Sequence, residues 1–245
     1  MPKIDSRMAK RLAELASLVY ESSEVIKTRY PDAHFLEKGD TQALLIREGD
    51  VDLLAFRGTE PTEWGDLKTD VDIVRVKYRL GALQAGKIHR GFKDALELVL
   101  EMIEEARRAD PEQPIYVTGH SLGGALAVLW AASQSARPGR VAGVYTFGAP
   151  RVGSPAFAAG YDNLFKDKTF QFQNRLDKIS RVPSRLRHVG HRLYFDADHE
   201  LHWNPEYKFW RFVDPRANYL KRGVGPKAWI QDHAMTQYLQ IVAAL

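Results

Sequence analysis

The chain has 245 residues, of which 44% are hydrophobic and 27% are charged, a balance that is typical of a globular protein and excludes a disordered or fibrous one. It contains no cysteine, which excludes disulfides, thiolate metal sites and a cysteine nucleophile, so covalent catalysis would have to use Ser, Thr, Lys or a carboxylate. The net charge is +4, but no nucleic-acid-binding motif accompanies the basic residues, and we expect them to form an ordinary solvated surface.

No stretch of the sequence has the composition of a membrane span or a linker. The longest uninterrupted apolar run, residues 125–132, is far shorter than the roughly 18 residues that a transmembrane helix needs. Residues 1–20 interleave charged and hydrophobic side chains, so we expect no signal peptide, and the compartment stays open because a cysteine-free chain suits oxidising and reducing surroundings alike. No segment rich in Pro, Gly or Ser divides the chain, which predicts a single domain over residues 1–245.

The first half of the chain predicts two helices separated by a β-hairpin. Apolar residues recur at i, i+3, i+4 and i+7 spacing up to about Arg29, where a Tyr-Pro pair ends the predicted N-terminal helix. Two short apolar runs, 42–47 and 51–56, flank a turn at residues 48–50 and predict paired strands. A second helical stripe covers residues 95–106.

The second half alternates short apolar strands with helices. Strands are predicted over residues 115–118, 141–147, 169–173 and 188–196, and helices over 122–136 and 229–245. Such alternation is typical of an α/β fold with a mainly parallel sheet covered on both faces, in which ligands bind beyond the carboxyl ends of the strands. Ser121 lies directly after one of these ends.

Ser121 stands in the sequence Gly-His-Ser-Leu-Gly, between a predicted strand and a predicted helix. A G-x-S-x-G turn in this context lifts the serine hydroxyl above the sheet, and Gly119 and Gly123 remove side chains that would clash in so tight a turn. The backbone N–H of Leu122 is then placed to bind the oxyanion that forms when serine attacks a carbonyl. The alternative is a compact strand-to-helix connection without chemistry. We favour the nucleophile because both flanking elements are present.

A nucleophilic serine needs a histidine base and a carboxylate that orients the base, and several residues compete for these roles. His120 adjoins the serine in sequence and points elsewhere, so we expect it to pack in the turn. His233 precedes the last helical stripe, as the α/β-hydrolase order of Ser, acid and His requires. Asp177 follows a predicted strand and is the preferred acid, with Asp196 and Asp198 as rivals.

Several motifs, in order along the chain, resemble the class 3 lipases, the fungal-type triacylglycerol lipases and their bacterial relatives. The resemblance runs from about residue 40 to 240 and rests on residues 56–59, 88–92, 118–124, 146–153, 174–183, 188–190 and 232–233 with Tyr238. It implies an α/β-hydrolase fold and a serine carboxylic-ester hydrolase, a lipase or esterase that cleaves acylglycerol-type esters without a cofactor or a metal.

The resemblance also implies roles for individual residues. Ser121 would be the nucleophile, Asp177 the acid and His233 the base. Thr59 is added by the resemblance, because its backbone N–H and hydroxyl would complete an oxyanion hole with Leu122.

Other functions stay open at this point. A phospholipase or an acyltransferase would use the same triad, and a non-catalytic basic binding protein could share the scaffold. Residues 60–67, where the lipases carry a lid, are short and acidic. Asp198, His199 and His202 form a cluster that would suit a metal but more often lies solvated in a loop. We expect an ester or lipid substrate, peripheral contact with a lipid interface, no nucleic acid and no transmembrane segment.

Overall fold

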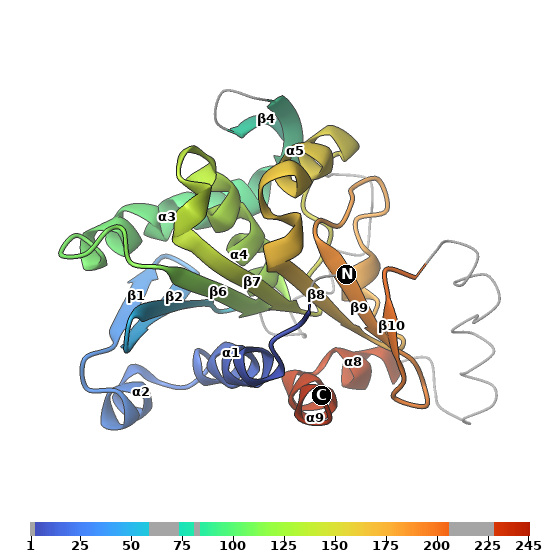
Figure 1. The fold of residues 1–245 in the computed structure, drawn as a ribbon, viewed down its shortest axis with the longest axis horizontal. Helices are drawn as coiled ribbons and strands as arrows, with labels where there is room; N and C mark the ends of the chain where they lie inside the picture. The colour runs from blue at the N-terminus through green and yellow to red at the C-terminus, as the bar shows by residue number, and fades with distance from the viewer. Residues whose placement is uncertain (1–2, 59–73, 81–83, 206–227) are drawn as a thin grey trace.

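The computed structural model describes residues 3–58, 74–80, 84–205 and 228–245 (Figure 1). Within them, eight strands form one sheet in the order β1-β2-β3-β6-β7-β8-β9-β10, and β4 pairs with β5 in a separate sheet. The strands are β1 (His34–Lys38), β2 (Thr41–Glu48), β3 (Val51–Phe56), β4 (Arg75–Leu80), β5 (Gln84–His89), β6 (Ile115–His120), β7 (Val141–Phe147), β8 (Thr169–Asn174), β9 (His191–Phe195) and β10 (Leu201–Trp203). The helices are α1 (Ser6–Leu18), α2 (Ser23–Arg29), α3 (Arg90–Ala106), α4 (Leu122–Ser133), α5 (Pro155–Phe165), α8 (Ala228–His233) and α9 (Met235–Ala243).

The centre of the large sheet is parallel. Strands β3, β6, β7, β8 and β9 run in the same direction, whereas β1, β2 and β10 are antiparallel to their neighbours. Figure 1 shows α3, α4 and α5 over one face of the sheet and α1, α8 and α9 over the other. The predicted α/β fold, with a mainly parallel sheet covered on both faces, is therefore confirmed.

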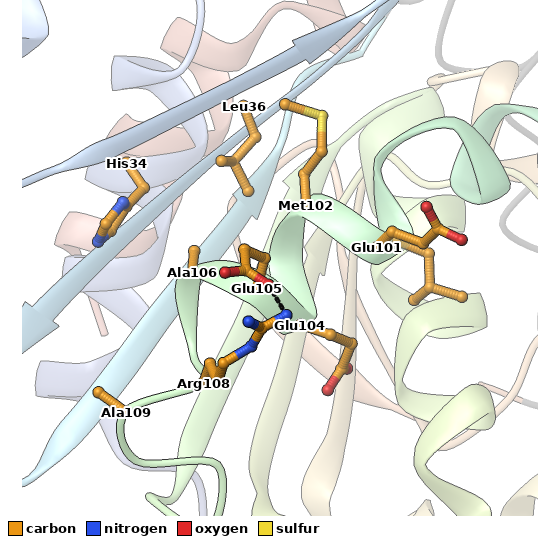
Figure 2. Close-up of a pocket in the computed structure, with 10 residues that line it drawn as sticks. His34, Leu36, Glu101, Met102, Glu104, Glu105, Ala106, Arg108 and Ala109 are labelled. Atoms are coloured by element: carbon orange, nitrogen blue, oxygen red, sulfur yellow. Dashed lines mark ion pairs between the residues drawn. The ribbon is translucent and has the colours of Figure 1, made fainter.

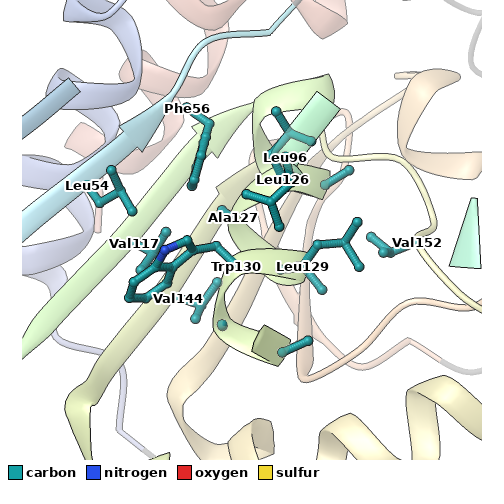
Figure 3. Close-up of a cluster of buried hydrophobic side chains, with 14 of the residues drawn as sticks. Leu54, Phe56, Leu96, Val117, Leu126, Ala127, Leu129, Trp130, Val144 and Val152 are labelled. Atoms are coloured by element: carbon teal, nitrogen blue, oxygen red, sulfur yellow. The ribbon is translucent and has the colours of Figure 1, made fainter. Parts of the chain in front are cut away.

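Helix α4 is apolar around its whole circumference and lies inside the larger core. Its Trp130 shares one hydrophobic cluster with Leu54, Val117 and Val144 from β3, β6 and β7 (Figure 3). A helix without a polar face must be covered on its outer side as well, and the buried stripe of α3 joins the same cluster. This packing on both sides holds the beginning of α4 in place, directly after Ser121.

Two predicted helices are each divided in the structure. The N-terminal prediction is wrong in its length, because the side chain of Ser22 accepts the N–H of Val25 at 3.4 Å and so starts a second helix, α2. The C-terminal helix is interrupted between α8 and α9, since Ala234 takes an extended conformation with ψ 137°. The interruption comes directly after His233 and matters for the site described below.

Several other boundaries differ from the prediction. The strand expected over 188–196 begins only at His191, because Gly190 turns the backbone before it with φ 64°. Helix α5, strands β1 and β10 and the β4–β5 hairpin were not predicted. Residues 60–67 lie outside the described residues. Among the helices that the structure describes, none has both the length and the hydropathy needed to cross a bilayer.

Candidate active site

Ser121 lies in a sharp turn between β6 and α4, at the carboxyl end of a central strand. Its φ of 58° and ψ of −129° are values that a residue with a side chain rarely adopts, and its N–H donates to the carbonyl of Phe147 at 2.9 Å. A Cβ on Gly119 would lie 2.2 Å from the carbonyl carbon of Gly123, and a Cβ on Gly123 would lie 2.0 Å from the carbonyl oxygen of Phe56. Close backbone approach therefore requires both glycines of the turn.

The structure brings Ser121, His233 and Asp177 together in one hydrogen-bonded chain. Nε2 of His233 lies 2.9 Å from Oγ of Ser121, and Nδ1 of His233 lies 2.8 Å from Oδ2 of Asp177. All three residues have 0% relative exposure. Because a carboxylate oxygen accepts hydrogen bonds, Nδ1 carries the proton and the lone pair of Nε2 faces the serine hydroxyl. This is the arrangement in which imidazole acts as a base toward serine.

The carboxylate of Asp177 is surrounded by donors on both oxygens. Oδ1 accepts the backbone N–H groups of Ile179 at 2.8 Å and Ser180 at 3.4 Å. Oδ2 accepts the hydroxyl of Tyr238 at 2.6 Å in addition to the imidazole of His233. These hydrogen bonds fix the rotation of the carboxylate, so Oδ2 stays directed at the imidazole.

Tyr238 has a place in this site that sequence reasoning did not give it. The motif put the residue near the histidine, but the hydrogen bond to Asp177 links α9 to the loop after β8 and is visible only in the fold. The same hydroxyl accepts the backbone N–H of Asn174 at 3.1 Å. Burial, and then the charge of Asp177, raise the pKa of Tyr238 well above its ordinary value. The hydroxyl therefore remains a donor to the carboxylate.

His120 is buried against the candidate base, as its expected packing in the turn implies. Its ring centroid lies 4.6 Å from that of His233, and its Nε2 lies 2.7 Å from the backbone carbonyl of His233. Its Nδ1 lies 3.0 Å from the hydroxyl of Tyr20. Burial, and then the neighbouring His233, lower the pKa of His120 well below its ordinary value. The ring is thus neutral, with its proton on Nε2, because a carbonyl can only accept.

Gly148 packs directly against the side chains of Asp177 and His233. Its φ is 62°, and a Cβ at this position would lie 2.7 Å from Oδ2 of Asp177 and 2.9 Å from Nδ1 of His233. The residue belongs to a motif noted in the sequence, yet its role was not predicted. A glycine directly after the end of a buried parallel strand is the signal that marks it.

Of the two expected oxyanion-hole residues, Leu122 is among the described residues and Thr59 is not. Leu122 is the first residue of α4, where backbone N–H groups have no partner inside the helix. Thr59 lies outside the described residues. Its neighbour Gly58 is described, and a Cβ on Gly58 would lie 3.1 Å from Cβ of Ser121. The chain therefore passes directly beside the serine just before Thr59.

The rival carboxylates Asp196 and Asp198 are not paired with His233. They lie in the turn between β9 and β10, where Oδ2 of Asp196 is 2.7 Å from Nε2 of His202 and its Oδ1 accepts the N–H of Asp198 at 2.9 Å. Of the three candidate acids, Asp177 is the one that contacts the base.

The sequence grouping of Asp198, His199 and His202, considered as a metal site and not favoured, has a different composition in the structure. Asp196, Glu200 and His202 are the residues whose ligand atoms lie within 4.8 Å of one another. Hydrogen bonds within the turn account for this grouping, since Asp196 accepts both the imidazole of His202 and the N–H of Glu200.

Comparison with protein families gives one match that covers more than half of the chain. Residues 53–186 match the family model described as Lipase (class 3). The matched segment includes Ser121 and Asp177, whereas His233 follows it.

Individual relatives are similar to this chain over part of their length. A secreted mono- and diacylglycerol lipase of Malassezia globosa is 30% identical over 163 residues, which are 62% of this chain and 54% of that protein. A lipase of Rhizomucor miehei is 35% identical over 131 residues, which are 49% of this chain and 34% of that protein. The chain thus spans between about a third and about half of these relatives. The crystal structure of a lipase from Rhizopus microsporus var. chinensis is similar in fold, with a TM-score of 0.69 at 23% identity over 86% of this chain and 83% of that one.

Proposed function

Because this chain belongs to the class 3 lipase family and has the α/β-hydrolase fold, we propose that it is a serine carboxylic-ester hydrolase that cleaves acylglycerol-type esters. The observation that carries the proposal is the hydrogen-bonded chain from Ser121 through His233 to Asp177, with distances of 2.9 and 2.8 Å. In this proposal Ser121 is the nucleophile, His233 the base and Asp177 the acid.

The first half of the reaction forms an acyl-enzyme. Oγ of Ser121 attacks the ester carbonyl while Nε2 of His233 takes the hydroxyl proton, and Asp177 stabilises the imidazolium that results. The carbonyl oxygen becomes an oxyanion and accepts the N–H of Leu122, with Thr59 proposed as the second donor. Each such donor lowers the barrier by roughly 3 to 4 kcal/mol. When the intermediate collapses, the ester C–O bond breaks and the proton on Nε2 passes to the leaving alcohol.

The second half of the reaction releases the acid. A water molecule attacks the acyl carbon and gives its proton to Nε2 of His233, and the second tetrahedral intermediate uses the same oxyanion donors. Collapse breaks the bond to Oγ of Ser121, which takes the proton back from the imidazolium. The protein ends in its starting protonation state, so the cycle consumes one ester and one water.

The family and the chemistry of the site support the proposed substrate class. The Malassezia globosa relative is named as a mono- and diacylglycerol lipase. The triad acts on an ester carbonyl whatever alcohol leaves, so phospholipids and acyl acceptors other than water are the alternatives that an assay must separate.

The test is a substrate series with wild-type protein and the Ser121→Ala variant. We expect the wild type to release fatty acid from mono-, di- or triacylglycerols faster than from phosphatidylcholine, and Ser121→Ala to lose about 10⁶-fold in kcat. Measuring free acid together with transesterified product separates hydrolysis from acyl transfer. Wild-type activity in Ser121→Ala would refute the proposal, and a preference for phosphatidylcholine would move it to a phospholipase.

A further inference from the structure

The β4–β5 hairpin carries a one-sided basic face. Successive side chains on a strand point to opposite sides, so Arg75, Lys77 and Arg79 share one face of β4. Lys87 of β5 is the register partner of Lys77 and lies on the same face. All four cations are exposed.

The opposite face of the hairpin is anchored to the core, which fixes the direction of the basic face. Val76 and Tyr78 pack against the cluster that contains α4, and the ring of Tyr78 meets that of Phe157 edge to face at 6.0 Å. Gly86 permits this approach, because a Cβ there would lie 2.5 Å from Cβ of Phe157. The hairpin therefore cannot turn its cations inward without losing these contacts.

The basic face gathers four positive charges on two neighbouring strands. Lys77 and Lys87 stand directly opposite each other, an arrangement of like charges that destabilises a strand pair. Among the residues that the structure describes, no carboxylate forms an ion pair with any of the four cations. Lys93 on α3, by contrast, is paired with Glu97 at 2.6 Å.

The face also borders a hollow and is joined to the candidate active site. Three of the cations, together with Gly86, Ser154 and Ala156, line a cavity of about 610 Å³ beside the beginning of α5. The hairpin pairs with the segment that follows Gly148. Ile88 forms a β-bridge with Gly153, the N–H of Lys87 donates to the hydroxyl of Ser154, and the N–H of Ser154 donates to the carbonyl of Lys87. Five positions separate Gly153 from Gly148 under the Asp177–His233 pair.

A contrasting hollow lies between β1 and the end of α3 (Figure 2). It measures about 1320 Å³, and its lining includes Glu101, Glu104 and Glu105. Among the described residues, Arg108 is the one Lys or Arg that lines it, and this side chain pairs with Glu105. The surface is thus acidic near β1 and basic at the β4–β5 hairpin, and the two regions would respond in opposite ways to an anionic partner.

We propose that the basic face of the β4–β5 hairpin docks the protein onto an anionic lipid surface. The choice of a lipid partner rests on the proposed function. The preference for an anionic surface rests on the exposed cations of the hairpin. A row of exposed Lys and Arg complements the phosphate groups of a leaflet. A single-stranded nucleic acid would call for aromatic side chains on the same face, whereas Tyr78 is directed to the other face.

Vesicle binding tests the proposal without depending on catalysis. Ether-linked phosphatidylcholine vesicles, with and without ether-linked phosphatidylglycerol, contain no carboxylic ester for the protein to cleave. We expect co-sedimentation with the anionic vesicles that weakens as salt is raised, and little with the neutral ones. Each cation near an anionic leaflet contributes about fivefold to partitioning, so the triple variant Lys77→Gln, Arg79→Gln, Lys87→Gln should lose about 100-fold. A protein that hydrolyses no ester can still bind these vesicles, so failure of the esterase proposal would not change the binding result. A protein that does not bind the vesicles can still hydrolyse a soluble ester, so failure of the docking proposal would not change the esterase proposal.

A matched control removes the same number of charges away from the hairpin. Lys27→Gln, Arg29→Gln and Lys38→Gln change exposed cations of α2 and β1, and Figure 1 shows α2 at the lower left and β4 at the top. We expect this variant to bind like the wild type, and Lys77→Arg with Lys87→Arg to keep binding because the charges are kept. Because the Gln variant also relieves the repulsion between Lys77 and Lys87, it should unfold no more easily than the wild type.

Four outcomes would overturn the proposal. They are equal binding to neutral and anionic vesicles, full binding by the hairpin variant, an equal loss in the matched control, and tighter binding of a competing oligonucleotide than of the anionic vesicles.

Discussion

Nε2 of His120 donates to the backbone carbonyl of His233 at 2.7 Å, across 113 positions of sequence. The carbonyl of His233 accepts this hydrogen bond where Ala234 leaves the helical conformation between α8 and α9, and the N–H of Gln237 donates to the carbonyl of Ala234. The hydroxyl of Tyr20 lies 3.0 Å from Nδ1 on the other side of the ring. The residue before the candidate nucleophile therefore supports the backbone of the candidate base.

We expect His120→Ala to lower kcat for a soluble ester about 10- to 100-fold. The backbone carbonyl of His233 loses its hydrogen bond, and a small displacement of a catalytic side chain lowers the reaction rate steeply. His120→Gln keeps an N–H donor and should recover part of the rate, while Tyr20→Phe should have a smaller effect. The rates are measured per active site by titration with a covalent inhibitor, so a loss of folded protein is not counted. Wild-type kcat in His120→Ala would contradict this role.

We expect Gly148→Ala to disrupt the site, because the added Cβ would lie 2.7 Å from Oδ2 of Asp177. Gly49→Ala is the matched control, since its φ of 59° is similar and a Cβ there meets nothing within 4 Å. Both variants lose roughly 1 to 2 kcal/mol of stability through positive φ. Only Gly148→Ala should also lower kcat/KM, by about 100-fold. Equal kcat/KM in the two variants would show that Gly148 acts only through its backbone.

We expect Tyr238→Phe to lower both stability and activity, because Oδ2 of Asp177 loses a donor at 2.6 Å and the N–H of Asn174 loses its acceptor. A buried hydrogen bond to a charged group is worth roughly 1.5 to 3 kcal/mol. Urea denaturation measures the first effect, and kcat/KM, expected to fall about tenfold, measures the second. Asp177→Asn is the reference for complete loss of the acid and should cost about 10⁴-fold in kcat. A Tyr238→Phe variant with unchanged kcat/KM would mean that the hydroxyl only stabilises the fold.

Low pH should destabilise the protein in part through His188. This residue contacts the loop that carries Asp177, with its Nε2 2.6 Å from the carbonyl of Ser180. Burial, and then Arg151 and Arg192, lower the pKa of His188 to about 3. A histidine in an unfolded chain has a pKa near 6.5, so between about pH 6.5 and pH 3 the unfolded state binds a proton that the folded state does not bind. The free energy of unfolding therefore falls as the pH drops through this range. Between pH 7 and pH 5 this costs about 1 to 2 kcal/mol, the lower value allowing for the part of the ring that water reaches.

The measurement is the unfolding free energy at pH 7 and pH 5 in wild type and His188→Gln. The variant should lose less stability on acidification than the wild type, whereas His34→Gln, which removes an exposed histidine of β1, should lose as much as the wild type. The same pH dependence in all three proteins would exclude His188 as a source.

The centre of the fold could be predicted because its signals are local. Strand β7 is a run of mostly apolar residues, and the turn at Ser121 is recognisable from glycines that close backbone contacts require. The family could be predicted as well, because its motifs recur in order, and the family match confirms it. The position of Asp177 after a strand favours it as the acid over Asp196 and Asp198, and the resemblance selects the same residue. The contact between Asp177 and His233 itself is visible only in the fold.

The remainder depends on contacts between distant residues. The break at Ala234 follows from no proline or glycine, and the alanine itself favours a helix, so tertiary contacts override its propensity. The alternation of cations and apolar residues in β4 is the pattern of a half-buried strand, but each run of the β4–β5 hairpin is only six residues long and β5 contains a glycine. The support of His233 by His120 joins two turns that only the closed sheet brings together.

Covalent labelling tests the central claim, that Ser121 is an activated nucleophile, most directly. The protein is treated with a fluorophosphonate, digested and mapped by mass spectrometry. We predict one adduct, on the peptide that contains Ser121, absent in Ser121→Ala and formed at least about 10³-fold more slowly in His233→Ala. A folded wild-type protein that carries no label, or carries it on a different residue, would contradict the claim.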